Sequence, residues 1–361
     1  MRFNSLMTIA AASAAIALAG CSANSTSAIA PTAGSAGQAR TTHFAFGHST
    51  SVLPPALQAR LAHPVKSDPR VSHNSCPSSG TLIYVSDAAL GLVNIYDSTL
   101  TMCGQLSGFV EPQGMTVHHG NLYVANTLGS PNGTGEIDEF HRGATTPFRK
   151  YTDPSGPYVV DVAVTRDAVI GSNIFNPNTG IGSISGFTRG GTFVSNVLLP
   201  NMLESFFVDA KDNGTLFSDG FDDITFTSTF WTFTCPGGAC SAGTELGQAM
   251  SFPGGIVDTQ SADILASDQL GNTGDTFEMP SLTPATFATT SGGDTVTLDE
   301  LGNPGDRPSP SGPVPVYGAD AVNNQLACYI YKQNGSSTGT CGTAAGNSGG
   351  QALGVAVDAG S

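Results

Sequence analysis

Short apolar runs broken by turn residues fill the chain from Gly80 onward, beginning with GTLIYVSD (Gly80 to Asp87). The runs are rich in Val, Ile, Leu and Phe, and the residues between them are mostly Gly, Asn, Asp and Pro, which favour tight turns. Apolar positions show no sustained 3.6-residue period there, so long amphipathic helices are not expected. The pattern predicts an all-β body of many short strands.

One two-strand phrase recurs in this region: a turn residue, an apolar strand often closing on Asp, a short turn and a second apolar strand. Its copies are PQGMTVHHGNLYVAN (112–126), PYVVDVAVTRDAVIGSN (157–173), LESFFVDAKDNGTLFSD (203–219), FPGGIVDTQSADILASD (252–268), VYGADAVNNQLACYIY (316–331) and the terminal QALGVAVD (351–358). The equivalent positions are Val117, Val164, Val208, Val257, Ala319 and Val357. Their spacings of 38 to 62 residues are in the range of a four-stranded propeller blade.

The two ends of the chain complement each other. The segment from Gly80 to Asp97 has the form of a second and third strand with no first strand before it, whereas the terminal phrase is a first strand with nothing after it. The sequence therefore predicts a six-bladed β-propeller over residues 76–361, closed by pairing the C-terminal strand with the first blade, which removes an exposed sheet edge. A β-solenoid or a sandwich is the alternative.

The phrases PQGMTVHHGNLYVAN and QALGVAVD resemble the repeats of NHL-type six-bladed propellers, whose relatives include the senescence-marker/gluconolactonase family. The resemblance covers residues 80–361 and implies a ligand site at one mouth of the central channel. In the lactonase relatives Glu, Asn and Asp side chains bind a divalent metal there. The corresponding candidates in this chain are Gln113, Tyr158, Glu204 and Gln351. Only Glu204 is anionic, so neither a metal nor another cofactor is expected.

The N-terminal segment resembles a bacterial lipoprotein precursor. Residues 1–20 hold one Arg and a run of small apolar residues, and Leu18-Ala19-Gly20 stands directly before Cys21. We expect a signal peptide over 1–20, palmitate-type lipidation of Cys21, and a flexible Ser/Ala/Pro-rich tether over 21–75. An ordinary signal peptide is the alternative. The anchor would place the protein on the bacterial cell envelope, without indicating which membrane.

Six cysteines remain once Cys21 is set aside, and they fall into three local pairs. In an exported protein these pairs predict disulfides. The expected bonds are Cys76–Cys103, Cys235–Cys240 and Cys328–Cys341. Free buried thiols are the alternative, and CPGGAC stands too far from other Cys or His to suggest zinc.

The net charge of the chain and its remaining motifs argue against two classes of function, nucleic-acid binding and calcium binding. A formal net charge of −15 repels nucleic acid. The calcium-like segment Asp209 to Asp223 is better explained by a hairpin turn at Asp212-Asn213-Gly214, and its later acids are expected to be solvated loop residues: Asp219, Asp222 and Asp223.

Three further motifs are better explained by ordinary structural roles than by a functional site. GNSGG around Ser348 fits a linker, because no protease-like His context accompanies it. His118 and His119 fit an exposed turn. The aromatic run FTSTFWTFTC (226–235) fits packing between sheets better than a carbohydrate platform.

The sequence thus favours a monomeric, lipid-anchored binding or scaffolding module for a protein or glycan partner. A lactonase-like or lyase-like enzyme with its site at the channel mouth is the alternative, and no catalytic residue is identified for it. The number of acidic and amide groups that converge at the mouth distinguishes the two hypotheses.

Overall fold

A computed structural model describes a large part of the unit 65–361. The described residues are 73–211, 213–222, 228–246, 253–258, 263–268, 273–278, 283–288, 296–301, 314–320, 323–331 and 339–360. Cys21, the predicted signal peptide and most of the predicted tether lie outside them. The described part is all-β apart from one short 3-10 turn, η1 (Pro236–Gly238), and none of its helical segments could span a membrane.

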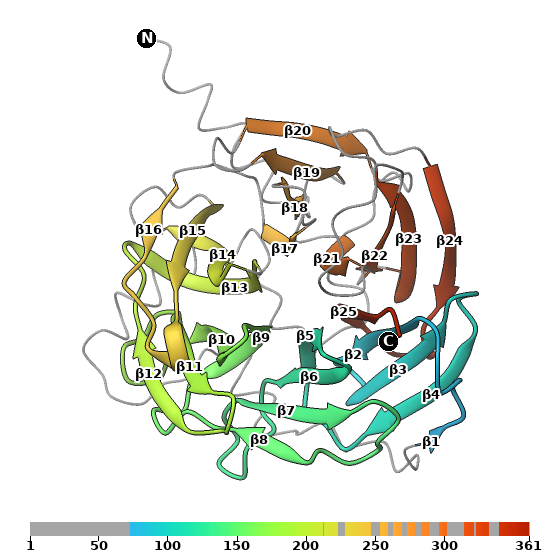
Figure 1. The fold of residues 1–361 in the computed structure, drawn as a ribbon, viewed down its shortest axis with the longest axis horizontal. Helices are drawn as coiled ribbons and strands as arrows, with labels where there is room; N and C mark the ends of the chain where they lie inside the picture. The colour runs from blue at the N-terminus through green and yellow to red at the C-terminus, as the bar shows by residue number, and fades with distance from the viewer. Residues whose placement is uncertain are drawn as a thin grey trace. The chain divides into compact units, whose positions relative to one another are not determined.

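The described strands form six antiparallel sheets (Figure 1). In five of them the strands follow one another in chain order. These five sheets are β5 (Pro112–His118), β6 (Asn121–Asn126), β7 (Glu136–His141) and β8 (Arg149–Tyr151); β9 (Tyr158–Val164), β10 (Ala168–Phe175), β11 (Ser183–Thr188) and β12 (Phe193–Val197); β13 (Met202–Ala210), β14 (Thr215–Asp222), β15 (Ser228–Thr234) and β16 (Thr244–Glu245); β17 (Pro253–Asp258), β18 (Asp263–Asp268), β19 (Thr273–Glu278) and β20 (Thr283–Ala288); and β21 (Val296–Leu301), β22 (Val314–Asp320), β23 (Gln325–Tyr331) and β24 (Gly339–Ala345).

The sixth sheet joins the two ends of the described chain. Its strands, in spatial order, are β1 (His73–Asn74), β4 (Met102–Ser107), β3 (Leu92–Asp97), β2 (Leu82–Asp87) and β25 (Ala352–Asp358). β25 is antiparallel to β2, with Leu82 opposite Asp358 and Val85 opposite Val355. Every residue of β25 is buried. The C-terminal strand is therefore an integral part of the N-terminal sheet.

The innermost strands contact one another in succession. β25 contacts β5, β5 contacts β9, β9 contacts β13, β13 contacts β17, β17 contacts β21, and β21 contacts β25. In Figure 1 these strands lie nearest the common centre of the six sheets. Apolar side chains fill the spaces between neighbouring sheets, as where Met115 of β5 packs in one cluster with Tyr84 and Ala356 of the adjoining sheet.

The fifth copy of the repeated phrase was assigned to the wrong strands. Val316 and Ala319 lie in β22, the second strand of its sheet, and the innermost strand is β21, which precedes them. The equivalence of Ala319 with Val117 is therefore wrong. First and second strands both bury alternate apolar residues, so periodicity alone does not tell one from the other.

Three disulfides link Cys76 to Cys103, Cys235 to Cys240, and Cys328 to Cys341, which confirms the expected bonds. Such bonds are typical of an oxidising, extracytoplasmic compartment. The Cys235–Cys240 loop also joins two sheets, because Ser195 Oγ of β12 donates to the carbonyl of Gly238 at 2.7 Å.

The turn between β5 and β6 agrees with the sequence for His119, which is exposed there, whereas His118 is the last residue of β5 and is half-buried. His119 and Gly120 connect β5 to β6 with φ of 50° and 73°, and two successive positive values are typical of a type I′ hairpin turn. Phe230, Trp231 and Phe233 are buried, as expected for packing residues, and Trp231 Nε1 donates to the carbonyl of Pro200 at 2.8 Å.

Candidate functional site

The four candidates for the channel mouth all lie at the beginning of innermost strands. Gln113, Tyr158 and Glu204 are in β5, β9 and β13, and Gln351 directly precedes β25; all four are buried. Their described contacts lie close to their own strands: Gln113 Nε2 donates to Glu111 at 3.4 Å, and the ring of Tyr158 stacks on Phe175. A shared ligand site for the four residues stays a prediction.

Glu204 differs from the other three candidates because it carries an acid into a buried position. Among the described residues, no donor lies within hydrogen-bond distance of its Oε2. Burial raises the pKa of Glu204 from 4.5 to about 8. A carboxyl group in this state can exchange a proton near neutral pH, which is the property of a general acid or base.

Two further acids lie close to this part of β13. Asp219 Oδ1 accepts from the amide of Phe207 at 2.9 Å, and Asp161 Oδ2 accepts from the next amide, that of Val208, at 2.8 Å. The register between β13 and β14 shifts at this point, which leaves these amides available. Each aspartate thus accepts a hydrogen bond from a backbone amide of β13 that has no partner in the ladder between β13 and β14.

Asp219 and Asp222 are buried in β14, so the expectation that they are solvated loop acids is wrong; Asp223 lies outside the described residues. The turn residues just before β14 in the sequence suggested a loop, but strand β14 continues as far as Asp222. Burial raises the pKa of Asp219 to about 8, and it raises that of Asp161 well above its usual range. The described residues contain no group of three or more His, Cys, Asp or Glu arranged to hold a metal.

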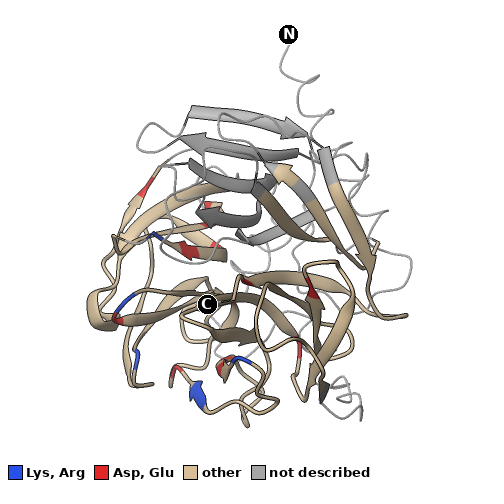
Figure 2. Ribbon diagram, turned by 45° about the vertical axis from the view of Figure 1, so that its right-hand side comes forward, with Lys and Arg blue, Asp and Glu red and all other residues tan. Residues whose placement is uncertain are grey.

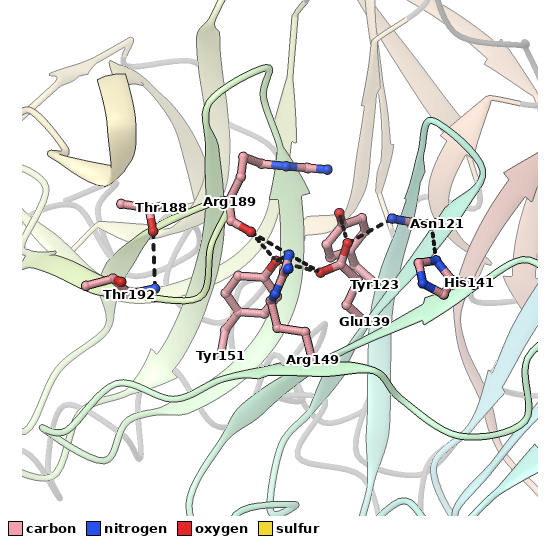
Figure 3. Close-up of polar contacts among 9 residues, drawn as sticks. All are labelled: Asn121, Tyr123, Glu139, His141, Arg149, Tyr151, Thr188, Arg189 and Thr192. Carbon is pink, nitrogen blue, oxygen red and sulfur yellow. Dashed lines mark hydrogen bonds and ion pairs between the residues drawn. The ribbon is translucent and has the colours of Figure 1, made fainter.

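A second polar cluster lies on the outer strands of the β5–β8 sheet and is centred on Glu139 (Figure 3). Glu139 is 1% exposed. Its Oε1 accepts from Asn121 at 2.9 Å and from Tyr123 at 2.5 Å, and its Oε2 accepts from Tyr151 at 2.7 Å and from Arg149 at 3.1 Å. Four donors satisfy the hydrogen-bonding capacity of a carboxylate.

Strand register produces this convergence. Tyr123 of β6 lies opposite Glu139 of β7, and Glu139 lies opposite Arg149 of β8. Residues that are directly opposite share one face of a sheet, so the three side chains meet. Burial raises the pKa of Tyr151 to about 12, and burial together with the hydrogen bond to Glu139 raises that of Tyr123. Both phenols therefore stay protonated donors at neutral pH.

The turn between β11 and β12 extends the cluster into the next sheet. Arg149 Nη1 donates to the carbonyl of Arg189 at 2.6 Å, and the hydroxyl oxygen of Tyr151, whose proton is donated to Glu139, lies 3.2 Å from the same carbonyl. The Arg189 guanidinium lies 5.2 Å from the centre of the Tyr123 ring. Figure 3 shows the Arg189 carbonyl oxygen facing the Arg149 guanidinium, whereas the Arg189 side chain extends away from it.

The outer side of the cluster carries an exposed aromatic pair. The Phe148 ring is 41% exposed, and the His141 ring stacks on it at 3.7 Å with an interplanar angle of 8°. The Arg149 guanidinium lies 5.3 Å from the centre of the Phe148 ring. An aromatic stack and a guanidinium are thus held side by side at the surface.

Sequence reasoning missed this cluster, although a signal was present. The segment EIDEFH (136–141) places three acids in one short strand, and the next strand begins with Arg149 and Lys150. Lys150 pairs with Glu136 at 2.5 Å and Asp138 at 3.2 Å. Buried acids need cations or other donors, so three acids followed by two cations indicated paired strands with matched charges.

No protein-family model matches the chain, and no curated protein matches it. Solved structures do match. A chain of a nidogen–laminin complex superimposes with a TM-score of 0.55 at 10% identity, covering 77% of this chain and 98% of that one. A candidate 6-phosphogluconolactonase from Bacteroides fragilis gives a TM-score of 0.51 at 11% identity, covering 79% and 100%. This likeness shows a β-propeller fold and carries no function.

Proposed function

We propose that this protein is a lipid-anchored, extracytoplasmic six-bladed β-propeller that acts as a binding or scaffolding module for a protein or glycan partner. The surface formed by Phe148, His141 and Arg149, rigidly held on buried Glu139, is the observation that carries the proposal. Exposed aromatic and Arg side chains are enriched among the residues that dominate binding energies. Here their geometry is set in advance by the network beneath them, which reduces the entropy lost on binding.

A binding experiment tests this surface. The full mature chain would be assayed by biolayer interferometry against envelope polysaccharides and detergent-extracted envelope proteins. We expect saturable binding that Phe148→Ser weakens at least about tenfold. Val194→Ser is the matched control, since Val194 is also 41% exposed but lies on β12. Equal effects of the two substitutions, or no binding by the wild-type protein, would contradict the proposal.

Six blades with a circular closure are supported by the six sheets, the pairing of β25 with β2 and the successive contacts of the innermost strands. Arg142 adds a link, because it pairs with Asp358 at the end of β25 and its Nη2 donates to the carbonyl of Gly80 at 2.6 Å. Deletion of 351–361 should therefore remove most of the stability of the fold. Deletion of 22–70 should change the melting temperature little, and equal melting of the two truncated proteins would argue against closure.

The anchor is a separate part of the proposal and rests on the sequence around Cys21. Two or more acyl chains on Cys21 give stable membrane attachment. Cys21→Ser should move the protein from the membrane fraction to the soluble fraction. Continued membrane fractionation of this variant would show that something other than Cys21 holds the protein.

A lactonase-like or lyase-like enzyme is the second candidate, favoured by Glu204 with its raised pKa near the start of an innermost strand. If such an enzyme used a metal at the channel mouth, chelation would lower the melting temperature by several degrees and a divalent cation would restore it. We expect chelation to have little effect. Glu204→Gln in a screen of sugar lactones distinguishes the two functions, because it should abolish only an enzymatic activity.

A further inference from the structure

The His141 ring is exposed at the surface, and one of its two nitrogens is held by the network around Glu139 (Figure 3). His141 Nδ1 lies 3.0 Å from Asn121 Oδ1, and Asn121 Nδ2 donates to Glu139 Oε1 at 2.9 Å. Asn121 lies opposite His141 in the register of β6 and β7, so the two side chains share one face of the sheet. A chain of hydrogen bonds thus runs from the buried carboxylate to the exposed ring.

This chain of hydrogen bonds fixes the tautomer of His141. A carboxylate oxygen only accepts hydrogen bonds, so the part of the Asn121 amide that faces Glu139 must be its NH2 group. The amide oxygen therefore faces His141, and because it also only accepts, the proton must be on Nδ1. In the neutral ring a proton on Nδ1 leaves Nε2 as a hydrogen-bond acceptor. None of the described residues donates a hydrogen bond to Nε2.

The groups around His141 suit a molecule with several hydroxyl groups. The centre of the His141 ring and the Arg149 guanidinium carbon lie 3.7 and 5.3 Å from the centre of the exposed Phe148 ring. Arg149 Nη1 is bonded within the protein, but the side chain is 36% exposed, so its other N–H groups can donate to a ligand. A hydrogen-bond acceptor and several donors therefore flank one aromatic ring. A sugar meets both, because each hydroxyl group donates and accepts while the apolar side of the sugar ring packs on an aromatic ring.

We propose that His141, held by Asn121 with its proton on Nδ1, is a specificity-determining residue of the recognition surface, and that the ligand is a neutral saccharide whose hydroxyl group donates to Nε2. The inference rests on the proposed binding function and specifies its ligand class. It assigns Asn121 the role of a positioning residue, which acts on the ligand only through the His141 ring.

The charges around this surface favour a neutral ligand. Lys and Arg are few among the described residues (Figure 2). Those next to Phe148 are offset, since Arg149 pairs with Glu139 and Lys150 pairs with Glu136. The surface therefore has little excess positive charge with which to attract an anionic saccharide or an anionic membrane. An extended peptide is disfavoured as well, because β8, the outer strand of the sheet, offers only three residues for strand addition.

The tautomer is tested without any ligand, by NMR spectroscopy of the full mature chain with nitrogen-15-labelled histidine at about pH 8. His141→Phe identifies the signals of His141. We expect the chemical shift of a protonated nitrogen for Nδ1 and that of an unprotonated nitrogen for Nε2. Asn121→Ala should remove this preference, whereas Asn132→Ala, the matched control at an exposed asparagine of the β6–β7 connection, should leave it unchanged. A proton on Nε2 of the neutral ring in the wild-type protein would overturn the inference.

The ligand class is tested by isothermal titration calorimetry of the same chain with maltohexaose, cellohexaose, chitohexaose and, as the charged probe, an oligogalacturonate. We expect saturable binding of at least one neutral saccharide. His141→Phe keeps a flat ring but removes the acceptor, so it should weaken this binding about three- to tenfold. Asn121→Ala should cause a similar loss and Asn132→Ala none. If Asn121→Ala also lowers the melting temperature, the result for His141→Phe decides.

This inference and the proposed function fail in distinguishable ways. Unchanged saccharide binding by His141→Phe would overturn the role of His141. If the wild-type protein binds only the oligogalacturonate, or only an envelope protein, and Phe148→Ser weakens that binding, the binding function stands and the neutral ligand class is wrong. If the wild-type protein binds neither a saccharide nor any envelope component, the binding function itself is wrong and the inference falls with it.

Discussion

Two buried glutamates of this propeller have opposite surroundings. Glu139, on the third strand of its sheet, receives hydrogen bonds from an arginine, two tyrosines and an asparagine. Glu204, on an innermost strand, has an oxygen with no donor among the described residues, and burial raises its pKa to about 8. The position of a carboxyl group relative to its donors, and not its burial alone, thus decides which protonation state the fold favours.

Because their surroundings differ, the two glutamates suit different roles. The Glu139 network holds Arg149 and the aromatic pair in a fixed arrangement, which suits recognition. Glu204 and Asp219 favour the protonated state and hold no cation in place among the described residues, so they link the stability of the inner strands to pH. In the proposed function the Glu139 position supports recognition, whereas the Glu204 position makes stability sensitive to pH.

The largest expected effect is on the pH dependence of stability. The folded-state pKa values of Glu204 and Asp219 lie near 8, above the ordinary values of 4.5 and 3.8, so the folded state binds more protons than the unfolded state between these values. Their contribution is complete below the ordinary values and is lost as the pH rises through the folded pKa near 8. Each group lowers the free energy of unfolding by at most about 1.4 kcal/mol per pH unit in that window.

Urea unfolding at a series of pH values between about 5 and 9 measures this effect. The double variant Glu204→Gln with Asp219→Asn is the control and should show a flatter profile. A wild-type profile as flat as that of the double variant would mean that the two carboxyl groups are hydrated and not buried as the structure describes.

A smaller loss is expected for Glu139→Gln at neutral pH. The substitution removes the charge that faces Arg149 and turns an amide NH2 toward two of the four donors. We expect the free energy of unfolding to fall by about 2–4 kcal/mol, limited because Arg149 is partly exposed and can be rehydrated. Thermal unfolding measures the loss, and Arg149→Met should reproduce only part of it. An unchanged melting temperature would contradict the network described for Glu139.

The smallest effect is expected for the same substitution at the other site. Glu204→Gln replaces a protonated carboxyl group by a neutral side chain of nearly the same shape, so stability at about pH 4, below the ordinary pKa of 4.5, should change by less than about 1 kcal/mol. At pH 9 the variant should be more stable than the wild-type protein, because its amide side chain carries no charge there. A large loss at about pH 4 would show that Glu204 has an essential partner.

Most features of the fold that the sequence predicted were predicted from turn residues and from the spacing of cysteines. The His119-Gly120 turn, the three disulfides and the burial of Trp231 follow from local signals, because each depends on residues close together in the chain. Ala319 was placed on the wrong strand because apolar alternation is the same in first and second strands. Asp219 was expected in solvent because the adjoining turn resembles a loop, whereas the strand continues and buries it.

The amino-acid sequence by itself determined the all-β character, the repeated strand pairs and the cysteine pairing, since alternation, turn residues and spacing act over short distances. Only the tertiary structure decided the register in which β25 pairs with β2, that Glu139 collects donors from β6 and β8, and that Arg189 of the next sheet reaches Tyr123. These contacts depend on strand register and on the packing of one sheet against another. The energy of a buried charge is set by such neighbours, which are distant in sequence, so no local pattern specifies it.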